Sequence, residues 1–330
     1  MRRAILILLI AAGLTPGLFW REIPPPPDTS QAVYFESLLA DGKPIALTRK
    51  GTLRLTGSWR LTSANEHFGS YSALLALDGA NLLAFSDRGK YLRFEVPPAA
   101  LEQDDMGPLF PELGNLKHLQ DVEAATRDAT TGTIWLGIEG SNSIARMQDD
   151  FSGLDMVRPV VMRDWRDNRG PEAFVRLRDG RFVVLAESGS RWSGKPNPGA
   201  VFASDPVAGG LWQPIGFEPP SGFLPTDMAQ LPDGRVLILL RSIRLGLPFA
   251  FGTRIVIADP DEISPGKVWP WRDFVSFDSR VPSDNYEGMA VVPGDPGEPL
   301  TIWLISDDNG ASVIQRTLLT RLEWNSSRKE

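Results

Sequence analysis

The sequence repeats one short unit five times, and this repeat restricts the fold more than any other feature. Each unit reads as a strand, a tight turn, a second strand and a polar end. The units are SALLALDGANLLAFSDRG from Ser72, VEAATRDATTGTIWLGIEGS from Val122, PEAFVRLRDGRFVVLAESGS from Pro171, TDMAQLPDGRVLILLRS from Thr226 and YEGMAVVPGDPGEPLTIWLISDDNG from Tyr286. Asp-Gly pairs begin at Asp78, Asp179 and Asp233, and they accept the positive φ that hairpins need. Each unit is therefore expected to form a local hairpin.

The spacing of the repeat predicts a β-propeller. Equivalent positions at Ser72, Glu123, Glu172, Asp227 and Glu287 are 51, 49, 55 and 60 residues apart, which suits one four-stranded blade per unit. The sequence beyond residue 30 has no long stretch of helical periodicity, so the predicted class is all-β with five or six four-stranded blades. Residues 31 to 66 either form a degenerate sixth blade or close the ring against the C-terminal RTLLTRLEW.

The composition excludes several classes of function. The chain has 330 residues and no cysteine, so disulfides, thiolate metal sites and cysteine nucleophiles are excluded. The net charge of -7 argues against nucleic-acid binding, which needs clustered Lys and Arg. The sequence also contains no GxSxG, Walker-type, HExxH or GxGxxG motif.

The N-terminus has the layout of an export signal. Two arginines precede a run without charge from Ala4 to Trp20, so residues 1–22 are interpreted as a signal peptide or as an inner-membrane tether through residues 4–20. A Pro-rich linker over residues 23–30 follows, and the propeller domain is expected over residues 31–330. The predicted location is periplasmic or extracytoplasmic, and the predicted state is a monomer.

Acidic residues stand at both ends of most hairpins. In an antiparallel hairpin the start of the first strand lies beside the end of the second. This pairs Ser72 with Asp87, Glu123 with Glu139, Glu172 with Glu187, Asp227 with Arg241, and Glu287 with Asp307. If these hairpins are the innermost strands of successive blades, the ten positions gather at one mouth of the central channel. Eight of them are carboxylates and one is an arginine.

So many carboxylates repel one another unless a cation, bound protons or basic groups compensate them. Ca²⁺ or another divalent cation, which prefers oxygen ligands, meets that need. The segment LISDDNG would add Asp307, Asp308 and Asn309 to the mouth. The alternative interpretation is structural, because acids at strand ends also cap turns or pair with arginines such as Arg88 and Arg241.

Two histidines and two arginines are candidates for contacting a substrate. His67 and His118 each stand five residues before a repeat start, where a loop would approach the same mouth. Each is interpreted either as a general base or ligand, or as a loop histidine bonded to backbone. Arg88 and Arg241 are expected either to bind the phosphate or carboxylate of a substrate or to be surface charges.

Several segments together resemble a known family. HFGSYSALLALDGANLLAFSDRG, DVEAATRDATTGTIWLGIEG, GPEAFVRLRDGRFVVLAE, YEGMAVVP and LISDDNGASVIQRTLL are similar to the phytase-like propeller family labelled "esterase-like activity of phytase". The resemblance implies a propeller with acids around its channel and, for the related propeller phytases, Ca²⁺-dependent hydrolysis of phosphomonoesters. It places the family's recurring acids on Asp87, Glu123, Glu139, Glu172, Glu187, Glu287, Asp307 and Asp308, with Asn309. The chain departs from the family's Glu-Gly pattern at Ala124 and Ala173, and it lacks the DAxDDPAxW-type segment of the propeller phytases.

The sequence therefore predicts an exported propeller that hydrolyses a small anionic ester or phosphoester with a divalent cation. The candidate catalytic residues are Glu123, Glu172, Glu287 and Asp307. The candidate substrate-binding residues are Arg88, Arg241, His67 and His118. The candidate cation ligands are Asp87, Glu139, Glu187, Asp227, Asp308 and Asn309. Two alternatives stay open, a lactonase-type propeller and a non-catalytic binding or scaffold propeller with a structural cation.

Overall fold

The structure is a computed structural model that describes residues 27–39, 42–49, 51–97, 105–114, 116–166, 169–187, 196–244, 250–310 and 315–325. This part of the chain contains 22 strands and no α-helix. Five single 3-10 turns lie between the strands: η1 (Pro111–Leu113), η2 (Lys117–Leu119), η3 (Glu139–Ser141), η4 (Val160–Met162) and η5 (Pro260–Glu262). The predicted all-β class is confirmed.

The strands form five antiparallel sheets, which are the blades of a propeller. Blade one contains β4 (Tyr71–Ala76), β5 (Asn81–Ser86), β6 (Lys90–Glu95) and β7 (Asp105–Pro108). Blade two contains β8 (Val122–Arg127), β9 (Ile134–Ile138), β10 (Ser143–Met147) and β11 (Asp155–Val157). Blade three contains β12 (Pro171–Arg176), β13 (Phe182–Ala186), β14 (Asn197–Phe202) and β15 (Trp212–Phe217). Blade four contains β16 (Leu224–Gln230), β17 (Val236–Arg244), β18 (Ala250–Ala258) and β19 (Arg272–Ser276).

Blade five joins the two ends of the described chain. It runs from β20 (Tyr286–Val292) through β21 (Leu300–Ser306) and β22 (Thr317–Trp324) to β3 (Leu53–Thr62) and β1 (Tyr34–Ser37), with β2 (Ile45–Ala46) paired to β3. Strand β3 pairs antiparallel with β22 from Leu53 to Leu61. Of the two alternatives for residues 31 to 66, ring closure against the C-terminal strand is therefore correct, and there is no sixth blade among the described residues.

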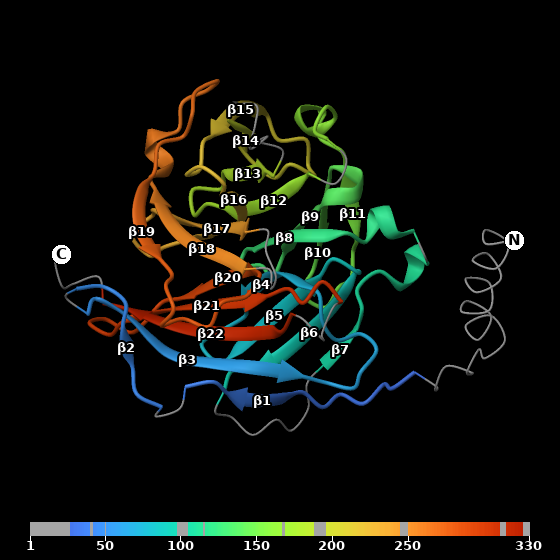
Figure 1. Cartoon of the computed structure of the whole chain (residues 1–330). Coiled ribbons are helices and arrows are strands. Elements are labelled where there is room, and N and C mark those ends of the chain that lie inside the picture. Colours follow the sequence, from blue (N-terminus) through green and yellow to red (C-terminus); the bar gives the residue numbers. More distant parts are fainter. Residues whose placement is uncertain are drawn as a thin grey trace, which may run out of the picture.

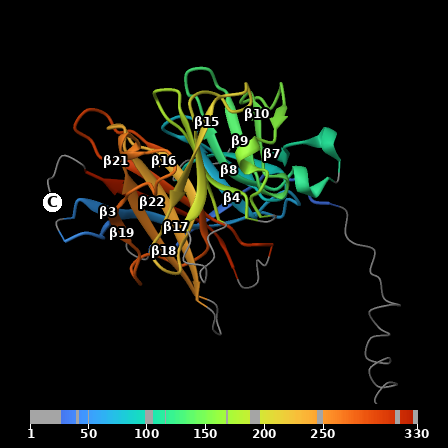
Figure 2. The same cartoon turned by 90° about the horizontal axis from the view of Figure 1, so that it is seen from above.

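The first strand of each repeat is the innermost strand of its blade. Figure 1 shows the five sheets around a shared centre, with β4, β8, β12, β16 and β20 nearest to it, and Figure 2 shows the same sheets turned by 90°. Each inner strand contacts the inner strand of the next blade, and β20 contacts β4 to complete the ring. All five run in the same direction along the channel, so their first residues meet at one mouth.

The hydrophobic core is divided among the blade interfaces. Each of five buried clusters lies between two successive blades. For example, Leu239 of blade four packs with Met289 and Leu304 of blade five, while Phe85 of blade one packs with Leu136 and Ile138 of blade two. The apolar side chains of each blade pack against those of the next blade. One blade alone would therefore not bury its core.

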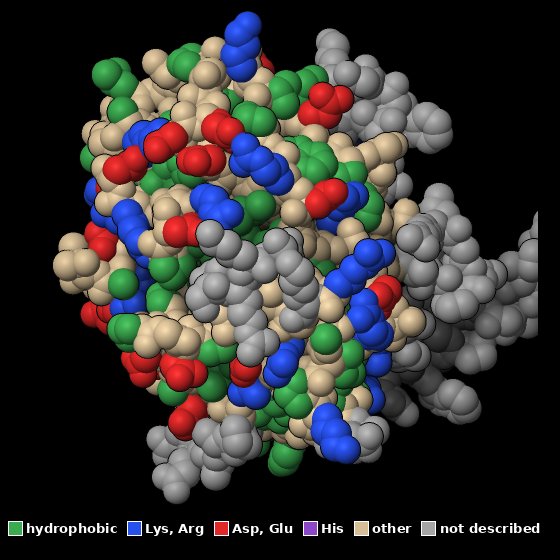
Figure 3. Space-filling view, turned by 90° about the vertical axis from the view of Figure 1, so that its left-hand side faces the viewer, with side chains coloured by type: hydrophobic (Ala, Val, Ile, Leu, Met, Phe, Trp, Pro, Cys, Tyr) green, Lys and Arg blue, Asp and Glu red, His purple; other side chains and the backbone are tan. Residues whose placement is uncertain are grey.

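The outer surface mixes both signs of charge. The face at the left of Figure 1, where β18 and β19 lie, shows basic and acidic side chains interspersed in Figure 3. Arg272 on β19 pairs with Glu262 of η5 at 3.0 Å, and both side chains are exposed. Such exposed pairs contribute little to stability. The residues that carry chemistry must therefore be sought where charges of one sign are buried.

The predicted N-terminal features lie outside the described residues. These are the signal peptide or anchor over residues 1–22 and most of the linker over residues 23–30. In the described part, no helix has the length and apolar character needed to cross a membrane.

Candidate functional site

Every inner strand is interrupted at its start by a one-residue shift in register. The shift leaves one residue unpaired in each blade: Ser72, Glu123, Glu172, Thr226 and Glu287. A residue in such a bulge is excluded from the ladder, and the bulge re-aims its side chain. Three of the five blades therefore present a glutamate at the same place on the channel wall.

The second strand of each hairpin supplies a neighbouring residue at the same mouth. In four blades this residue directly follows the last paired residue of the hairpin, and in blade four it is itself paired with Leu224: Asp87, Glu139, Glu187, Asp307 and, in blade four, Arg241. The backbone N–H of Glu139 donates to the carbonyl of Asp121 at 2.8 Å, and that of Asp307 donates to the carbonyl of Asn285 at 2.9 Å. The two sets form one ring at the channel mouth, here called the acid ring, in which seven of ten positions are carboxylates.

Asp227 does not belong to the acid ring, and its predicted alignment with the other acids is wrong by one residue. The register shift of blade four falls on Thr226, whose hydroxyl donates to the carbonyl of Leu239 at 3.4 Å. Asp227 Oδ1 accepts the N–H of Met228 at 2.7 Å, and Oδ2 accepts the N–H of Met289 at 2.6 Å. Burial raises the pKa of Asp227, and these amides oppose the shift. Asp227 thus ties blade four to blade five and is not carried forward as a cation ligand.

Carboxylates of the ring, together with the neighbouring Asp121, form two groups of three that are close enough to share one ion. The oxygens of Asp121, Glu123 and Glu139 lie within 4.8 Å of one another, and so do those of Glu139, Glu172 and Glu187. Calcium binds carboxylate oxygens at about 2.3–2.6 Å. Two oxygens on opposite sides of one calcium ion are therefore separated by about twice that distance, which is close to the separation within each group. The donor set therefore fits a hard divalent cation. Glu139 belongs to both groups, here called the first and the second triad.

Burial and mutual repulsion raise the pKa values of these acids. Burial raises the pKa of Glu123 well above its ordinary value, and Glu287, Glu139 and Asp87 raise it further. The pKa of Glu172 is raised in the same way by burial and then by Glu187 and Glu123. Burial also raises the pKa of Glu139, and a side-chain hydrogen bond with Glu172 opposes that shift. This part of the ring needs either a proton or a cation.

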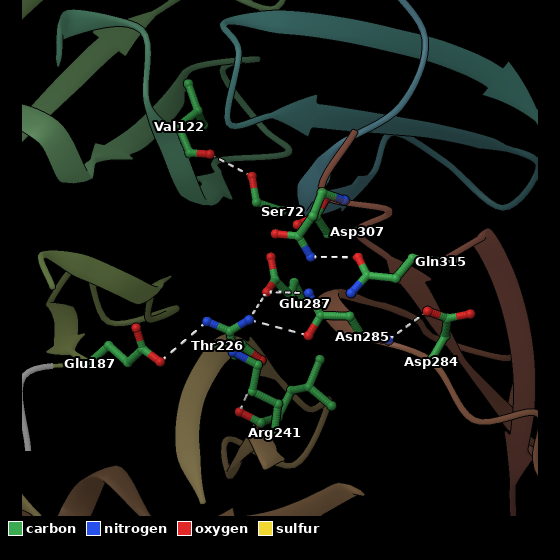
Figure 4. A network of polar contacts seen from close by, with 12 residues as sticks. Ser72, Val122, Glu187, Thr226, Arg241, Asp284, Asn285, Glu287, Asp307 and Gln315 are labelled. Carbon is green, nitrogen blue, oxygen red and sulfur yellow. Dashed lines mark hydrogen bonds and ion pairs between the residues drawn. The ribbon is translucent and has the colours of Figure 1, made fainter. Parts of the chain in front are cut away.

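Arg241 compensates the acids on the other side of the ring (Figure 4). Its Nη1 donates to Glu287 Oε1 and, at 3.2 Å, to Asn285 Oδ1, while Nη2 lies 3.2 Å from Glu187 Oε1. Asn285 Nδ2 also donates to Glu287 Oε1 at 2.8 Å. Burial lowers the pKa of Arg241, but the surrounding carboxylates, Glu287 first, outweigh it and raise the pKa overall. Arg241, which was predicted to bind substrate, therefore uses its Nη groups to contact two ring glutamates.

The segment after β21 divides its three polar residues between the ring and the turn. Burial, Glu287 and Asp87 raise the pKa of Asp307, and Asp307 Oδ1 accepts the N–H of Asn309 at 2.7 Å. Asp308 instead accepts the N–H groups of Ser70 and Gly310 at 3.1 and 2.9 Å. The exposed Asn309 donates from Nδ2 to Gln315 at 2.8 Å. Asp307 is thus the ring member, whereas the oxygens of Asp308 hold the turn together.

The two histidines and Arg88 lie around the ring. His67 Nε2 is 3.8 Å from Glu66 Oε1, and burial followed by the charge of Lys90 lowers the pKa of His67. His118 lies in η2, and its side chain is exposed to solvent. The Nε of Arg88, which is half exposed, is 3.9 Å from Asp87 Oδ1. The structure thus gives neither histidine a contact with a ring carboxylate among the described residues.

Basic side chains line the opposite mouth of the channel. A cavity of about 590 Å³ is lined by the far ends of all five inner strands and by Arg127, Arg176 and Arg178. Arg127 pairs with Asp149 at 3.2 Å, and Arg176 pairs with Asp128 at 2.9 Å. The concentration of uncompensated acid is therefore confined to one mouth.

Two residues of the site were missed by the sequence analysis. Asp121 completes the first triad, and Asn285 connects Arg241 with Glu287. Both stand two positions before the register shift of their blade, at Glu123 and Glu287. Extending the repeat by two residues toward the N-terminus would have found them.

Comparisons with known proteins found a family and several solved structures to which the chain is similar. A family model described as phytase-like, "Esterase-like activity of phytase", matches residues 66–310. A comparison with curated proteins found no match. The fold resembles the gluconolactonase XC5397 from Xanthomonas campestris (11% identity, TM-score 0.44, 87% of this chain and 97% of that chain). It also resembles a luciferin-regenerating enzyme (11% identity, TM-score 0.43, 88% and 95%) and a chain of a nidogen/laminin complex (10% identity, TM-score 0.42, 81% and 93%). At these identities and scores the likeness says nothing about activity.

Proposed function

The chain belongs to the phytase-like family, and from this premise we propose that it is a divalent-cation-dependent hydrolase of esters or phosphoesters, acting at the acid ring. One observation carries the proposal. In the second triad an acid of blade two and two acids of blade three bring their oxygens within 4.8 Å of one another, and the three acids of the first triad, all from the first hairpin of blade two, do the same. The repulsion between these carboxylates destabilises the folded protein, and a role in binding a cation explains why the acids are nevertheless placed together.

The two triads would hold the cation. Asp121, Glu123 and Glu139 are proposed as one ligand set, and Glu139, Glu172 and Glu187 as the other. A bound divalent cation, with Ca²⁺ as the first candidate, would polarise the carbonyl or phosphoryl oxygen of the substrate and make a water molecule more acidic. Glu187 and Glu287 would be oriented by Arg241, which is a positioning residue in this proposal.

Asp307 is the proposed general base. It is buried beside Glu287 and Asp87, which raise its pKa and make it a better proton acceptor. Asp307 Oδ1 is occupied by the N–H of Asn309, whereas Oδ2 accepts no hydrogen bond from the described residues. In the proposed reaction Oδ2 takes the proton of the attacking water.

The test is a panel of aryl esters, aryl phosphates and lactones, assayed in EDTA and in Ca²⁺. Turnover is expected only with the cation. Asp307→Asn should lower kcat about 100-fold or more while calcium still stabilises the protein. Glu262→Gln, an exposed acid of η5, serves as the matched control.

The panel also separates the competing functions. Turnover of lactones alone would indicate a lactonase-type propeller. Calcium binding without turnover of any substrate would contradict the hydrolase proposal and indicate a binding or scaffold propeller.

We further propose that the protein is exported or tethered to the inner membrane. The two arginines and the uncharged run over residues 4–20 support this. Fractionation of the cells and mass measurement of the mature N-terminus test it. Recovery of the full-length chain in the cytoplasmic fraction would contradict it.

A further inference from the structure

Two loops beside the acid ring present exposed apolar side chains together with exposed basic ones. The loop before β8 carries Leu116, which is 48% exposed, and the exposed Lys117. The loop before β12 carries Val160, which is 57% exposed, and the exposed residues Arg158, Arg163 and Arg166. These two segments, residues 116–119 and 158–166, are here called the mouth loops.

Both mouth loops pack against η3, the turn that carries Glu139. A Cβ on Gly140 would lie 2.8 Å from the Cα of His118, so the first loop lies directly against this turn. Asn142 Nδ2, at the end of the same turn, donates to the carbonyl of Trp165 in the second loop at 3.0 Å. Because Glu139 belongs to both triads, the mouth loops border the channel mouth on the side of the triads.

The basic charge of the mouth loops is largely uncompensated. Residues 158–166 contain three arginines and one acid, Asp164, while residues 116–119 contain Lys117 and no acid. Arg158 donates from Nη2 to the carbonyl of Arg163 at 3.1 Å. None of the four basic residues forms an ion pair with any residue that the structure describes. These cationic groups are therefore available to an anionic partner.

The N-terminal chain leaves the propeller at the same end. The carbonyl of Asp28 accepts the N–H of Glu66 at 2.9 Å, in the loop that leads to β4. The carbonyl of Ser70, in that same loop, accepts the N–H of the ring member Asp87 at 3.1 Å. Seven residues, 21–27, separate Asp28 from the uncharged run, and seven residues span at most about 25 Å. An anchor in that run would thus keep the acid-ring end close to the bilayer.

The opposite end of the propeller also exposes apolar side chains, but without basic neighbours. Leu211 is 82% exposed and Trp212 is 39% exposed. Trp212 pairs with Phe202, which pairs with the first residue of β13, so this turn lies away from the acid ring. Residues 203–212 contain no Lys or Arg. Isolated exposed apolar residues are common on soluble proteins, and this turn has nothing that would hold an anionic surface.

We propose that the mouth loops dock the protein on an anionic lipid bilayer, so that the acid ring opens toward the lipid surface. Exposed apolar side chains enter the interface, and neighbouring Lys and Arg bind acidic headgroups. The ring carboxylates are buried or half-buried in the channel, so the lipid meets the exposed basic groups first. The inference goes beyond the proposed hydrolysis, because no mouth-loop side chain belongs to the acid ring.

The experiment uses the absence of cysteine from the chain, which lets one introduced cysteine carry a label at one chosen site. An environment-sensitive dye is attached to the full chain at Leu116→Cys, Val160→Cys or, as the control at the opposite end, Leu211→Cys. Phosphatidylcholine vesicles with or without phosphatidylglycerol are then added in EDTA. The emission at positions 116 and 160 is expected to rise several-fold on the anionic vesicles and far less on the neutral ones, while position 211 stays unchanged.

The arginines are tested in the chain labelled at position 116. Arg158→Gln and Arg163→Gln should each lower the ratio of docked to undocked protein about fivefold, the effect of one basic residue near an anionic surface. Arg272→Gln, which removes an exposed arginine of blade four, should leave the ratio unchanged. Melting curves verify that each variant is folded.

The outcomes distinguish docking from the proposed hydrolysis. Glu123→Gln should stop turnover and keep the emission rise, whereas Arg163→Gln should weaken docking and keep turnover of a soluble substrate without vesicles. Unchanged emission at both 116 and 160 overturns the inference, whether or not the protein is a hydrolase. A larger rise at 211 also overturns it and assigns docking to the opposite end. An equal rise on neutral vesicles contradicts the role given to the basic residues.

Discussion

The guanidinium of Arg241 on blade four contacts the carboxylate of Glu287 on blade five and reaches back to Glu187 on blade three. The positively charged side chain of Arg241 thus joins three blades at the channel mouth. Arg241 takes the place that acids occupy in the other blades, and it compensates Glu187 and Glu287 from within the ring.

Replacing Arg241 should be costly. Arg241→Leu removes the only cationic partner of Glu187 and Glu287 among the described residues, so the free energy of unfolding in EDTA is expected to fall by about 3 kcal/mol. Urea denaturation measures the change. Arg272→Leu, which breaks an exposed pair with Glu262, should cost less than about 1 kcal/mol. Equal stability of the two variants would show that Arg241 is not needed to compensate the ring.

Calcium should stabilise the protein through Glu139. A ligand that binds only the folded state adds about 2.7 kcal/mol at 100 times its Kd, so Ca²⁺ is expected to raise the Tm. Glu139→Gln should lose most of this shift, because Glu139 belongs to both triads. Glu262→Gln removes an exposed acid and should keep the full shift. A Tm that does not respond to Ca²⁺ or EDTA in the wild type would contradict every cation-based function.

Asp227 should affect stability and leave the cation response unchanged. Asp227→Ala leaves the buried N–H groups of Met228 and Met289 without their acceptor, at a cost of about 3 kcal/mol. Asp227→Asn keeps one acceptor oxygen and should lie between that variant and the wild type. Denaturant unfolding in EDTA and in Ca²⁺ measures both effects. Loss of the calcium shift in Asp227→Asn would mean that this residue is a ligand after all.

The fold could be predicted because each hairpin is local in sequence. Turns such as Asp179-Gly180 and the apolar strands beside them are read from about twenty consecutive residues, and five copies define a ring. The number of blades could not be read in this way. It depends on β3 pairing with β22 from the other end of the chain, which no local pattern reveals.

The ring positions could be predicted from the sequence in those blades where an acid occupies the equivalent position of the repeat. Glu123, Glu172 and Glu287 fall on the register shifts, but in blade four the shifted residue is Thr226, which carries no charge to mark it. The adjacent Asp227 was the nearest acid and was aligned in its place. Register is set by backbone hydrogen bonds, so a one-residue shift changes which side chain meets the channel.

The buried acids should also give the cation-free protein an unusual dependence on pH. The pKa values of Glu123 and Glu172 are raised in the folded state, so the folded protein binds more protons than the unfolded chain above the ordinary value of 4.5. Stability is therefore fully present below that pH and is lost as the pH rises toward the raised pKa values. His67 has a lowered pKa, so its own contribution to stability rises with pH up to the ordinary value of 6.5. This opposes the effect of the acids, but it comes from one group only.

In EDTA the Tm is therefore expected to fall between pH 5 and pH 8. Glu172→Gln imitates the protonated acid, so its Tm at pH 8 should exceed that of the wild type and its curve should be flatter. Saturating Ca²⁺ should remove the decline, because cation binding strengthens as the ligands lose their protons. Melting curves at half-unit steps measure all three, with Glu262→Gln as the control acid. A Tm in EDTA that rises over this range would show that the acid ring is compensated without a cation, and the proposed site would lose its physical basis.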